Sequence, residues 1–346
     1  MNAHRAEALL AALPKAELHL HLEGSIEPAT VVEVAARDGV ALTPEEAAAR
    51  YVYDNFDEFL EAFKWVTSFL RAPADYALIT ERLAEQLLCQ NVVYAEVTLS
   101  VGVMLRRKQD PEANFGAIRE AAERAQRNGL RLRWVFDAVR QFGAEAAMEV
   151  ARCAAEMKAE GVVAFGMGGD ELALPASEFR RVYDYAASQG LRRLIHAGEI
   201  GGPESVREAV EWLGAERIGH GIAVMHDERL MDSLTARRIP LELCPTSNLR
   251  TGALARQLGR AEAKVEDHPL RRLFERGLAV TLSTDDPAMF HTDLSSEYRL
   301  GLALGMEPKA LARIAEMGFE HAFLPAEEKQ PLLEAFQNKK SALGLL

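Results

Sequence analysis

Eight short runs of apolar and β-branched residues alternate along the chain with longer segments whose apolar residues have helical spacing. The runs occupy residues 16–23, 92–100, 130–139, 161–168, 192–199, 216–221, 239–245 and 277–286. Alternating strands and helices predict a parallel sheet covered by helices, and no Pro-, Gly- or Ser-rich linker interrupts the series. Eight such units are enough to close a barrel. We therefore expect residues 1–346 to form a single α/β domain, a (β/α)8 TIM barrel.

Two stretches contain more helix than a minimal barrel needs. Residues 28–90 hold several helical segments, which predicts a helical insertion after the first strand. Phe56, Phe59 and Phe63 of this insertion fall on one helical face, with Trp65 nearby, and form either an apolar lid over the site or ordinary core packing. Residues from about 293 to the end are expected to add helices outside the barrel.

Charge and cysteine content exclude several classes of protein. The formal net charge is −12 and the main basic cluster is the short run 106–108, so nucleic acid is not an expected partner. The three cysteines are far apart and form no CxxC pair, which argues against disulfides and a thiolate zinc site. No apolar stretch approaches the roughly 18 residues of a membrane span, and the first residues do not resemble a signal peptide. These features predict a cytoplasmic protein.

Polar residues collect at the ends of the predicted strands, and the carboxyl ends of the strands form the active site of such barrels. His19 and His21 lie at the end of the first strand. Because side chains alternate along a strand, both histidines point to the same face. Two inward-facing imidazoles need either a metal ion or hydrogen-bonding partners in the core, and imidazole is a good zinc ligand.

Later strand ends supply further ligands. His196 lies in the fifth strand and Asp285 in the eighth. Together with His19 and His21 they offer three nitrogens and one oxygen, which suits one zinc ion with a position left for water. A zinc-bound water ionises near neutral pH and becomes a nucleophile. The sequence therefore predicts a hydrolytic zinc centre, with ordinary core histidines as the alternative.

Three more residues at the strand ends are candidates for catalysis. Glu199 lies three residues beyond His196, where it is either an acid or base beside the metal or a solvated loop carboxylate. His220 lies between two glycines, where the backbone can bend tightly, and is otherwise a core histidine. Asp286 faces away from Asp285 if the backbone is extended, and its alternative role is to cap the helix that Pro287 begins.

The segments PKAELHLHLEGS, HAGE, RIGHG, LCPTSN and STDDP occur in this order between about residues 14 and 287. In this order they resemble the signature of the adenosine deaminase family within the amidohydrolase superfamily. The resemblance implies a one-zinc barrel hydrolase that acts on a C–N bond, replaces the 6-amino group of an adenine ring and releases ammonia. The segment VVAFGMGG has no lysine, which fits one metal ion rather than two.

The resemblance also implies a role for each matching residue. The zinc ligands would be His19, His21, His196 and Asp285. Glu199 would protonate the purine N1 as C6 is attacked, and such positioned acid catalysis contributes about 10²–10⁴ in rate. His220 would position and polarise the attacking water, and Asp286 would hydrogen-bond that water or the ring N7. Gly169 would offer its backbone N–H to the purine N3, where a side chain would obstruct the ring.

Three substrates are consistent with the resemblance: adenosine, free adenine, and 6-aminodeoxyfutalosine, a carboxybenzoyl-bearing adenine nucleoside of menaquinone synthesis. Adenine deaminases tend to replace the GGDE stretch with serines. Adenosine deaminases tend to carry, at the position of Glu23, an Asp that meets the ribose 5′-hydroxyl, and an Arg-aromatic-x-Pro stretch where this chain has TLSVGVMLRRKQD. We therefore favour aminodeoxyfutalosine over adenosine, with adenine third.

The carboxylate of aminodeoxyfutalosine would suit an arginine. The candidates by location, each otherwise a surface residue, are Arg71, Arg106, Arg107 and Arg140. A barrel that binds metal or nucleoside without chemistry is the competing class, and the presence of Glu199, His220 and Asp286 argues against it. The expected partner is a small purine nucleoside, with neither nucleic acid nor membrane, and the sequence leaves the oligomeric state open.

Overall fold

The computed structural model describes residues 3–53 and 55–346. Its eight strands follow one another in the spatial order β1 to β8. They span Lys15–His21, Val92–Leu99, Arg131–Val139, Val162–Gly168, Arg192–Ala197, Arg217–His220, Leu241–Leu243 and Val280–Leu282. Every neighbouring pair from β1–β2 to β7–β8 is parallel. All eight predicted strands are therefore confirmed.

Backbone hydrogen bonds join the first strand to the segment that follows the last. The His21 N–H donates to the Asp285 carbonyl at 2.8 Å, and the Asp285 N–H donates to the His19 carbonyl at 3.0 Å. An isolated parallel bridge between Leu20 and Asp285 results. The sheet thus closes into the predicted TIM barrel, and the closing contact is made by three of the predicted site residues.

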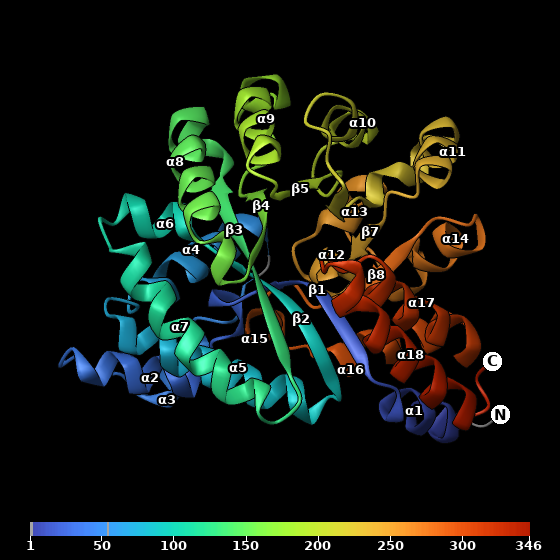
Figure 1. Cartoon of the computed structure of the whole chain (residues 1–346), viewed down its shortest axis with the longest axis horizontal. Coiled ribbons are helices and arrows are strands. Elements are labelled where there is room, and N and C mark those ends of the chain that lie inside the picture. The colour runs from blue at the N-terminus through green and yellow to red at the C-terminus, as the bar shows by residue number, and fades with distance from the viewer. Residues whose placement is uncertain (1–2, 54) are drawn as a thin grey trace.

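Helices surround this sheet (Figure 1). The α-helices α1 to α18 span Ala3–Ala12, Pro28–Arg37, Pro44–Ala49, Phe56–Thr67, Pro73–Cys89, Val101–Arg106, Pro111–Gln126, Gly143–Glu156, Arg180–Ser188, Pro203–Glu211, Glu228–Arg237, Pro245–Arg250, Ala253–Gln257, Leu270–Glu275, Pro287–Phe290, Leu294–Ala303, Pro308–Glu320 and Ala326–Ala342. The 3-10 helices η1 to η6 span Glu23–Ser25, Arg140–Phe142, Lys158–Glu160, Ala176–Phe179, Ile222–His226 and Val265–Asp267.

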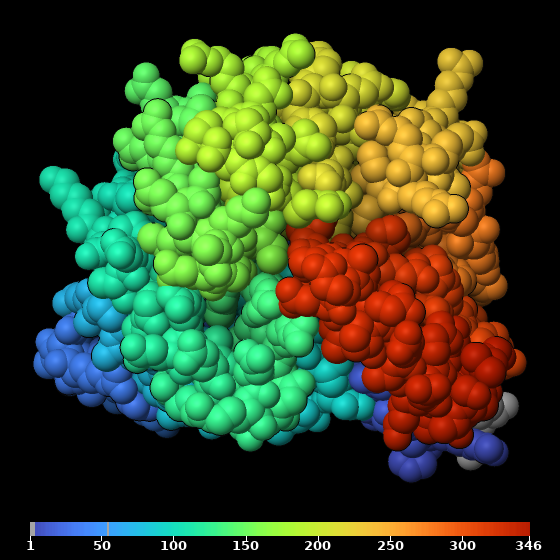
Figure 2. Space-filling model, in the orientation of Figure 1, coloured from blue at the N-terminus to red at the C-terminus, as the bar shows by residue number. Residues whose placement is uncertain are grey.

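Both predicted additions to the barrel are confirmed. Helices α2 to α5 form the insertion between β1 and β2, and α16 to α18 follow the last strand. Helix α17 packs against β1 and β8, and Figure 1 shows α17 and α18 on the same side of the barrel as α1. In Figure 2 the C-terminal helices, in red, form one continuous patch on the surface.

Local sequence explains two elements that position the site. In β1, Leu18 and Leu20 alternate with the histidines and belong to the main hydrophobic core, so the histidines point to the opposite face. Helix α4 begins after Asn55, whose side-chain oxygen accepts a hydrogen bond from the Glu58 N–H at 3.0 Å.

Within the described part of the chain, no helix combines the length and apolar character needed to cross a membrane.

Candidate active site

The predicted metal ligands meet at the carboxyl ends of their strands. The Nε2 atoms of His19 and His21 each lie 3.3 Å from Asp285 Oδ1, and His21 Nε2 lies 3.4 Å from His196 Nε2. His220 also reaches the cluster, because one ligand atom from each of His19, His196, His220 and Asp285 falls within 4.8 Å of the others. All these residues are buried or nearly so. The structure therefore brings the four predicted ligands together and adds His220 as a competitor of His21.

Two of these residues have an uncommon backbone conformation. The φ angle is +61° at His220 and +67° at Asp285, in the left-handed region. A side chain held there costs on the order of 1–3 kcal/mol, and such residues cluster at functional sites. The left-handed turn at Asp285 replaces the extended backbone that the sequence suggested. Opposite directions for Asp285 and Asp286 were expected only for an extended backbone, a condition that is not met here, and both residues line the same cavity.

The hydrogen bonds of His19 show that the cluster suits a metal ion. His19 Nδ1 donates to Glu242 Oε2 at 2.8 Å, while its buried Nε2 has no hydrogen-bond partner. This partner places the proton on Nδ1 and leaves the Nε2 lone pair facing Asp285, as in metal sites where a carboxylate orients a histidine ligand. Glu242 is held in turn by Arg217, whose Nε lies 2.5 Å from Glu242 Oε1.

The charge states of the histidines also indicate that the cluster suits a metal ion. Burial lowers the pKa of His21 to about 4 and that of His196 well below its usual value, so both are neutral at pH 7, as ligation requires. Burial also opposes a charge on His19, but its interactions with the Asp285 and Glu242 carboxylates outweigh burial and raise its pKa to about 10. The position between His19 and Asp285 therefore attracts positive charge, which a metal ion would provide.

A chain of hydrogen bonds fixes the protonation of His220. The Leu270 N–H donates to His268 Nδ1 at 3.2 Å, so the proton of His268 is on Nε2, 3.3 Å from Asn248 Oδ1. The Asn248 amide then donates to His220 Nδ1 at 3.1 Å. Neutral His220 must carry its proton on Nε2, which lies 3.6 Å from Glu199 Oε2. A protonated nitrogen does not bind a metal, so this chain favours His21 over His220 as the fourth ligand.

The two predicted catalytic carboxyl groups line the cavity next to the cluster. Burial, followed by the negative charge of Asp285, raises the pKa of both Glu199 and Asp286 well above the usual values. Asp286 Oδ1 is buried without a hydrogen-bond partner among the described residues, and the Asp286 side chain does not cap α15. An added Cβ at Gly24 would lie 1.8 Å from Asp286 Oδ1, so glycine is needed there. Both carboxyl groups are thus available to a ligand rather than engaged in structural hydrogen bonds.

The wall of the cavity combines apolar and polar surface. Phe56, Phe59 and Phe63 of α4 all line it, in agreement with a cover over the site. Trp65 lies outside it and stacks on Phe69, with ring centroids 5.0 Å apart. Gly169 also lines the cavity with φ +88°, and an added Cβ would approach Gln141 Oε1 to 2.4 Å. Its position is consistent with the predicted backbone contact to a purine.

Glu23 lies one layer behind this wall. Its Oε1 accepts a hydrogen bond from the Ser100 N–H at 3.0 Å, and Ser100 itself lines the cavity. Glu23 Oε2 is buried and has no partner among the described residues, and burial raises the pKa of the carboxyl to about 7. The structure therefore places Glu23 beside Ser100, beyond the direct lining, where it supports the wall of the cavity.

The four candidate arginines have other partners. Arg71 pairs with Asp38 at 3.2 Å, and Arg107 donates to Thr67 Oγ1 at 3.0 Å. Arg106 stacks on the Phe142 ring. Arg140 donates to the backbone carbonyls of Glu171 and His196. Arg140 is buried, so the expectation of a surface residue is wrong there. Lys64 of α4 is the cationic residue among the described residues that line the cavity.

Several residues of the site were missed by sequence reasoning. They are Asp137, Glu171, Glu242, Ser247, Asn248 and His268. Asp137 lines the cavity, and burial raises its pKa to about 8. Ser247 Oγ donates to Asp285 Oδ2 at 2.7 Å. The available signals were the polar residues of LCPTSN and GGDE, and a single Glu within the apolar run IPLELCP.

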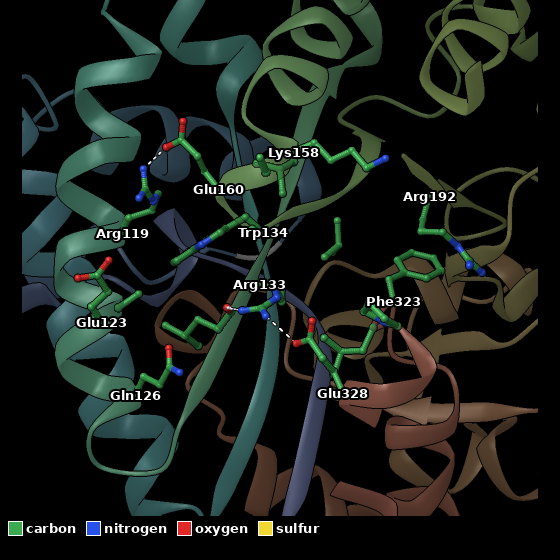
Figure 3. A pocket seen from close by; sticks show the side chains of 18 of the residues that line it. Arg119, Glu123, Gln126, Arg133, Trp134, Lys158, Glu160, Arg192, Phe323 and Glu328 are labelled. Atoms are coloured by element: carbon green, nitrogen blue, oxygen red, sulfur yellow. Dashed lines mark hydrogen bonds and ion pairs between the residues drawn. The ribbon is translucent and has the colours of Figure 1, made fainter. Parts of the chain in front are cut away.

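A second hollow lies at the opposite end of the barrel, where β3 and β4 begin. Figure 3 shows its charged side chains turned toward one another, with Arg133 2.8 Å from Glu328 and Arg119 paired with Glu160. Lys158 donates to the Gln189 carbonyl at 3.0 Å. Active sites of these barrels form at the carboxyl ends of the strands, so we place the active site at the histidine cluster.

The fold and this cluster define a barrel hydrolase of the amidohydrolase type that acts on C–N bonds. A family model described as adenosine deaminase matches residues 14–339. The chain belongs to the adenosine deaminase family.

Named relatives and solved structures agree with this assignment. The chain is 39% identical over 329 residues to an aminodeoxyfutalosine deaminase of Streptomyces avermitilis, covering 93% of this chain and 90% of that protein. An adenine deaminase of Rhizobium leguminosarum bv. trifolii is 33% identical, with coverages of 93% and 98%. The crystal structure of an adenine deaminase from Arthrobacter aurescens superposes with a TM-score of 0.86 at 28% identity, covering 94% and 98%. An amidohydrolase from Burkhoderia ambifaria, crystallised with bound Zn, gives 0.86 at 25% identity, with coverages of 99% and 94%.

Proposed function

We propose that this hydrolase is a zinc-dependent 6-aminodeoxyfutalosine deaminase. The observation that carries the proposal is the composition of the cavity, whose lining includes Phe56, Phe59 and Phe63 together with Lys64 and the acid Glu199. An apolar wall with one cation suits an aromatic group that bears a carboxylate, which adenosine and adenine lack. The 39% identity to a protein named aminodeoxyfutalosine deaminase supports the same substrate.

The metal of the proposal is zinc, and its ligands are the four residues His19, His21, His196 and Asp285. Three imidazole nitrogens and one carboxylate oxygen are donors that suit zinc. When bound, zinc acts as a Lewis acid and lowers the pKa of a water molecule to near neutrality. The bound Zn in the related Burkhoderia ambifaria structure supports this choice of ion.

The surrounding residues would do the remaining chemistry. Burial raises the pKa of Glu199 and so favours its acid form, which would give its proton to the purine N1. His220 would donate from Nε2 to the attacking oxygen, because the Asn248 amide occupies its Nδ1. Asp286, with an unpartnered Oδ1, would accept a hydrogen bond from that oxygen or take part in binding the ring. Gly169 would contact the purine edge with its backbone N–H.

A comparison of three substrates tests the proposal directly. We expect kcat/KM for 6-aminodeoxyfutalosine to exceed that for adenosine and adenine, measured by the change in purine absorbance and by ammonia release. A higher kcat/KM for adenosine or adenine would reject aminodeoxyfutalosine as the preferred substrate but would still support a deaminase. Failure to release ammonia from any of the three would reject the enzyme and favour a barrel that only binds its ligand.

Replacing Lys64 by glutamine tests how the tail of the substrate is recognised. The Lys64 side chain is 62% exposed and its ammonium pairs with Glu61 at 2.7 Å, so any ion pair with the substrate would be screened by solvent. We expect kcat/KM for aminodeoxyfutalosine to fall by about two- to fivefold, as for exposed pairs of this kind. The internal control is adenosine, which has no carboxylate and should be deaminated at the unchanged rate. An equal loss for both substrates would contradict a role in binding the carboxylate.

A further inference from the structure

One buried carboxylate, that of Glu171, binds the loop that carries Glu199. It accepts hydrogen bonds from four consecutive backbone N–H groups, those of residues 198 to 201, at 2.5–3.1 Å. A fifth comes from the Ser205 hydroxyl in the first turn of α10, at 2.5 Å. Glu171 is only 7% exposed. All five donors lie within residues 198–205, which run from the end of β5 into the first turn of α10, so a single side chain binds this whole stretch.

The backbone on both sides of this contact is also held by side chains. Arg140 donates through Nη1 to the Glu171 carbonyl at 3.1 Å and through Nη2 to the His196 carbonyl at 3.3 Å. Arg140 therefore ties the segment that bears Glu171 to the end of β5. On the far side of the loop, Gln257 donates to the carbonyls of Glu199 at 2.8 Å and Gly201 at 2.7 Å. The loop is thus clamped through its N–H groups and through its carbonyls.

The sequence of the loop permits this close approach. An added Cβ at Gly201 would lie 2.6 Å from Glu171 Oε1. Gly198 has φ +69°, and an added Cβ there would lie 2.5 Å from Val206 Cγ2. Glycine at both positions lets the backbone wrap around the carboxylate. Residues 198–202 lie outside the helices and strands, so these side-chain contacts take the place of a backbone ladder.

From this geometry we propose that Glu171 is a positioning residue for catalysis, which holds the Glu199 carboxyl at the reacting atoms. Its effect is exerted through the loop backbone, since its carboxylate is fully engaged by residues 198 to 205 and is absent from the lining of the cavity. The inference rests on the proposed role of Glu199 as the acid. Glu171 would thus be a second carboxylate that affects kcat without contacting the substrate.

Glu171→Gln tests the proposal, because the amide keeps the shape but turns a donor toward N–H groups. We expect kcat to fall by about 10²-fold, the cost of a misplacement near 1 Å, with KM and bound metal close to wild type. Hydrogen exchange of the peptide covering 198–205 should be faster than in wild type. Glu178→Gln, an exposed carboxylate of the following segment, is the matched control and should leave both readouts unchanged.

A double-mutant cycle separates positioning from general destabilisation. If Glu171 acts through Glu199, Glu171→Gln should change kcat little in a Glu199→Gln background. Effects that multiply in the double variant would overturn the proposal, as would unchanged exchange in residues 198–205. If Glu171→Gln does not fold, Ser205→Ala and Gln257→Leu each remove one side of the clamp and should lower kcat in the same way. Exchange is measured without substrate, so it tests the clamp even if all three purines prove inert.

Discussion

Glu199→Gln is expected to lower kcat by about 10²–10⁴-fold with little change in KM, because the amide can still hydrogen-bond the purine N1 but has no proton to give. The structure supports the acid form of this residue. Burial and the charge of Asp285 raise the pKa of its carboxyl well above the usual value, which favours the protonated form of Glu199. Its Oε2 also lies 3.6 Å from His220 Nε2, close to the proposed position of attack.

Steady-state kinetics with the preferred purine measure this effect. Glu204→Gln is the matched control, since Glu204 is a carboxylate of the same region, is 70% exposed and pairs with Arg207 at 3.1 Å. Metal analysis and thermal unfolding should show that Glu199→Gln keeps its ion and its fold. A kcat within a few-fold of wild type would remove Glu199 from the role of acid and shift attention to Asp286 or Asp137, the other buried acids of the cavity.

Periodicity and order along the chain were enough to predict the barrel and to bring the main site residues together. The period of two in β1 directs His19 and His21 to one face, and the barrel rule places His196, His220 and Asp285 at the same end. These inferences need only local pattern and one topological rule. They succeed because a parallel barrel places the ends of all its strands together, whatever the loops do.

The parts that could not be predicted depend on contacts between distant segments. Glu171 and Glu242 bind groups 25 or more residues away, and the spacing of the residues around them does not indicate those partners. The left-handed turn at Asp285 arises where that residue pairs with β1 across the barrel closure. Arg140 was expected at the surface because arginine is usually exposed. It is buried instead, because its guanidinium donates hydrogen bonds to three backbone carbonyls.

Metal analysis of two histidine variants distinguishes the alternative ligand sets. We expect His21→Ala to lose the bound ion and His220→Asn to retain about one zinc ion per chain while losing activity. The reason is the chain from Leu270 through His268 and Asn248, which leaves His220 with its proton on the Nε2 that faces the site. His21 has no comparable donor to Nδ1 among the described residues, and its Nε2 lies 3.3 Å from Asp285 Oδ1.

The choice of asparagine at 220 matters for this comparison, because φ is +61° there and asparagine tolerates the left-handed region better than alanine. Loss of the ion in His220→Asn can then be attributed to the missing imidazole rather than to backbone strain. Both variants are dialysed against chelator, reloaded with zinc and analysed for metal per chain. Retention of the ion in His21→Ala together with its loss in His220→Asn would make His220 the ligand. If His220 were the ligand, the Asn248 side-chain oxygen would have to accept a hydrogen bond from His220 Nδ1. Asn248→Asp would then preserve this hydrogen bond, and Asn248→Leu would remove it.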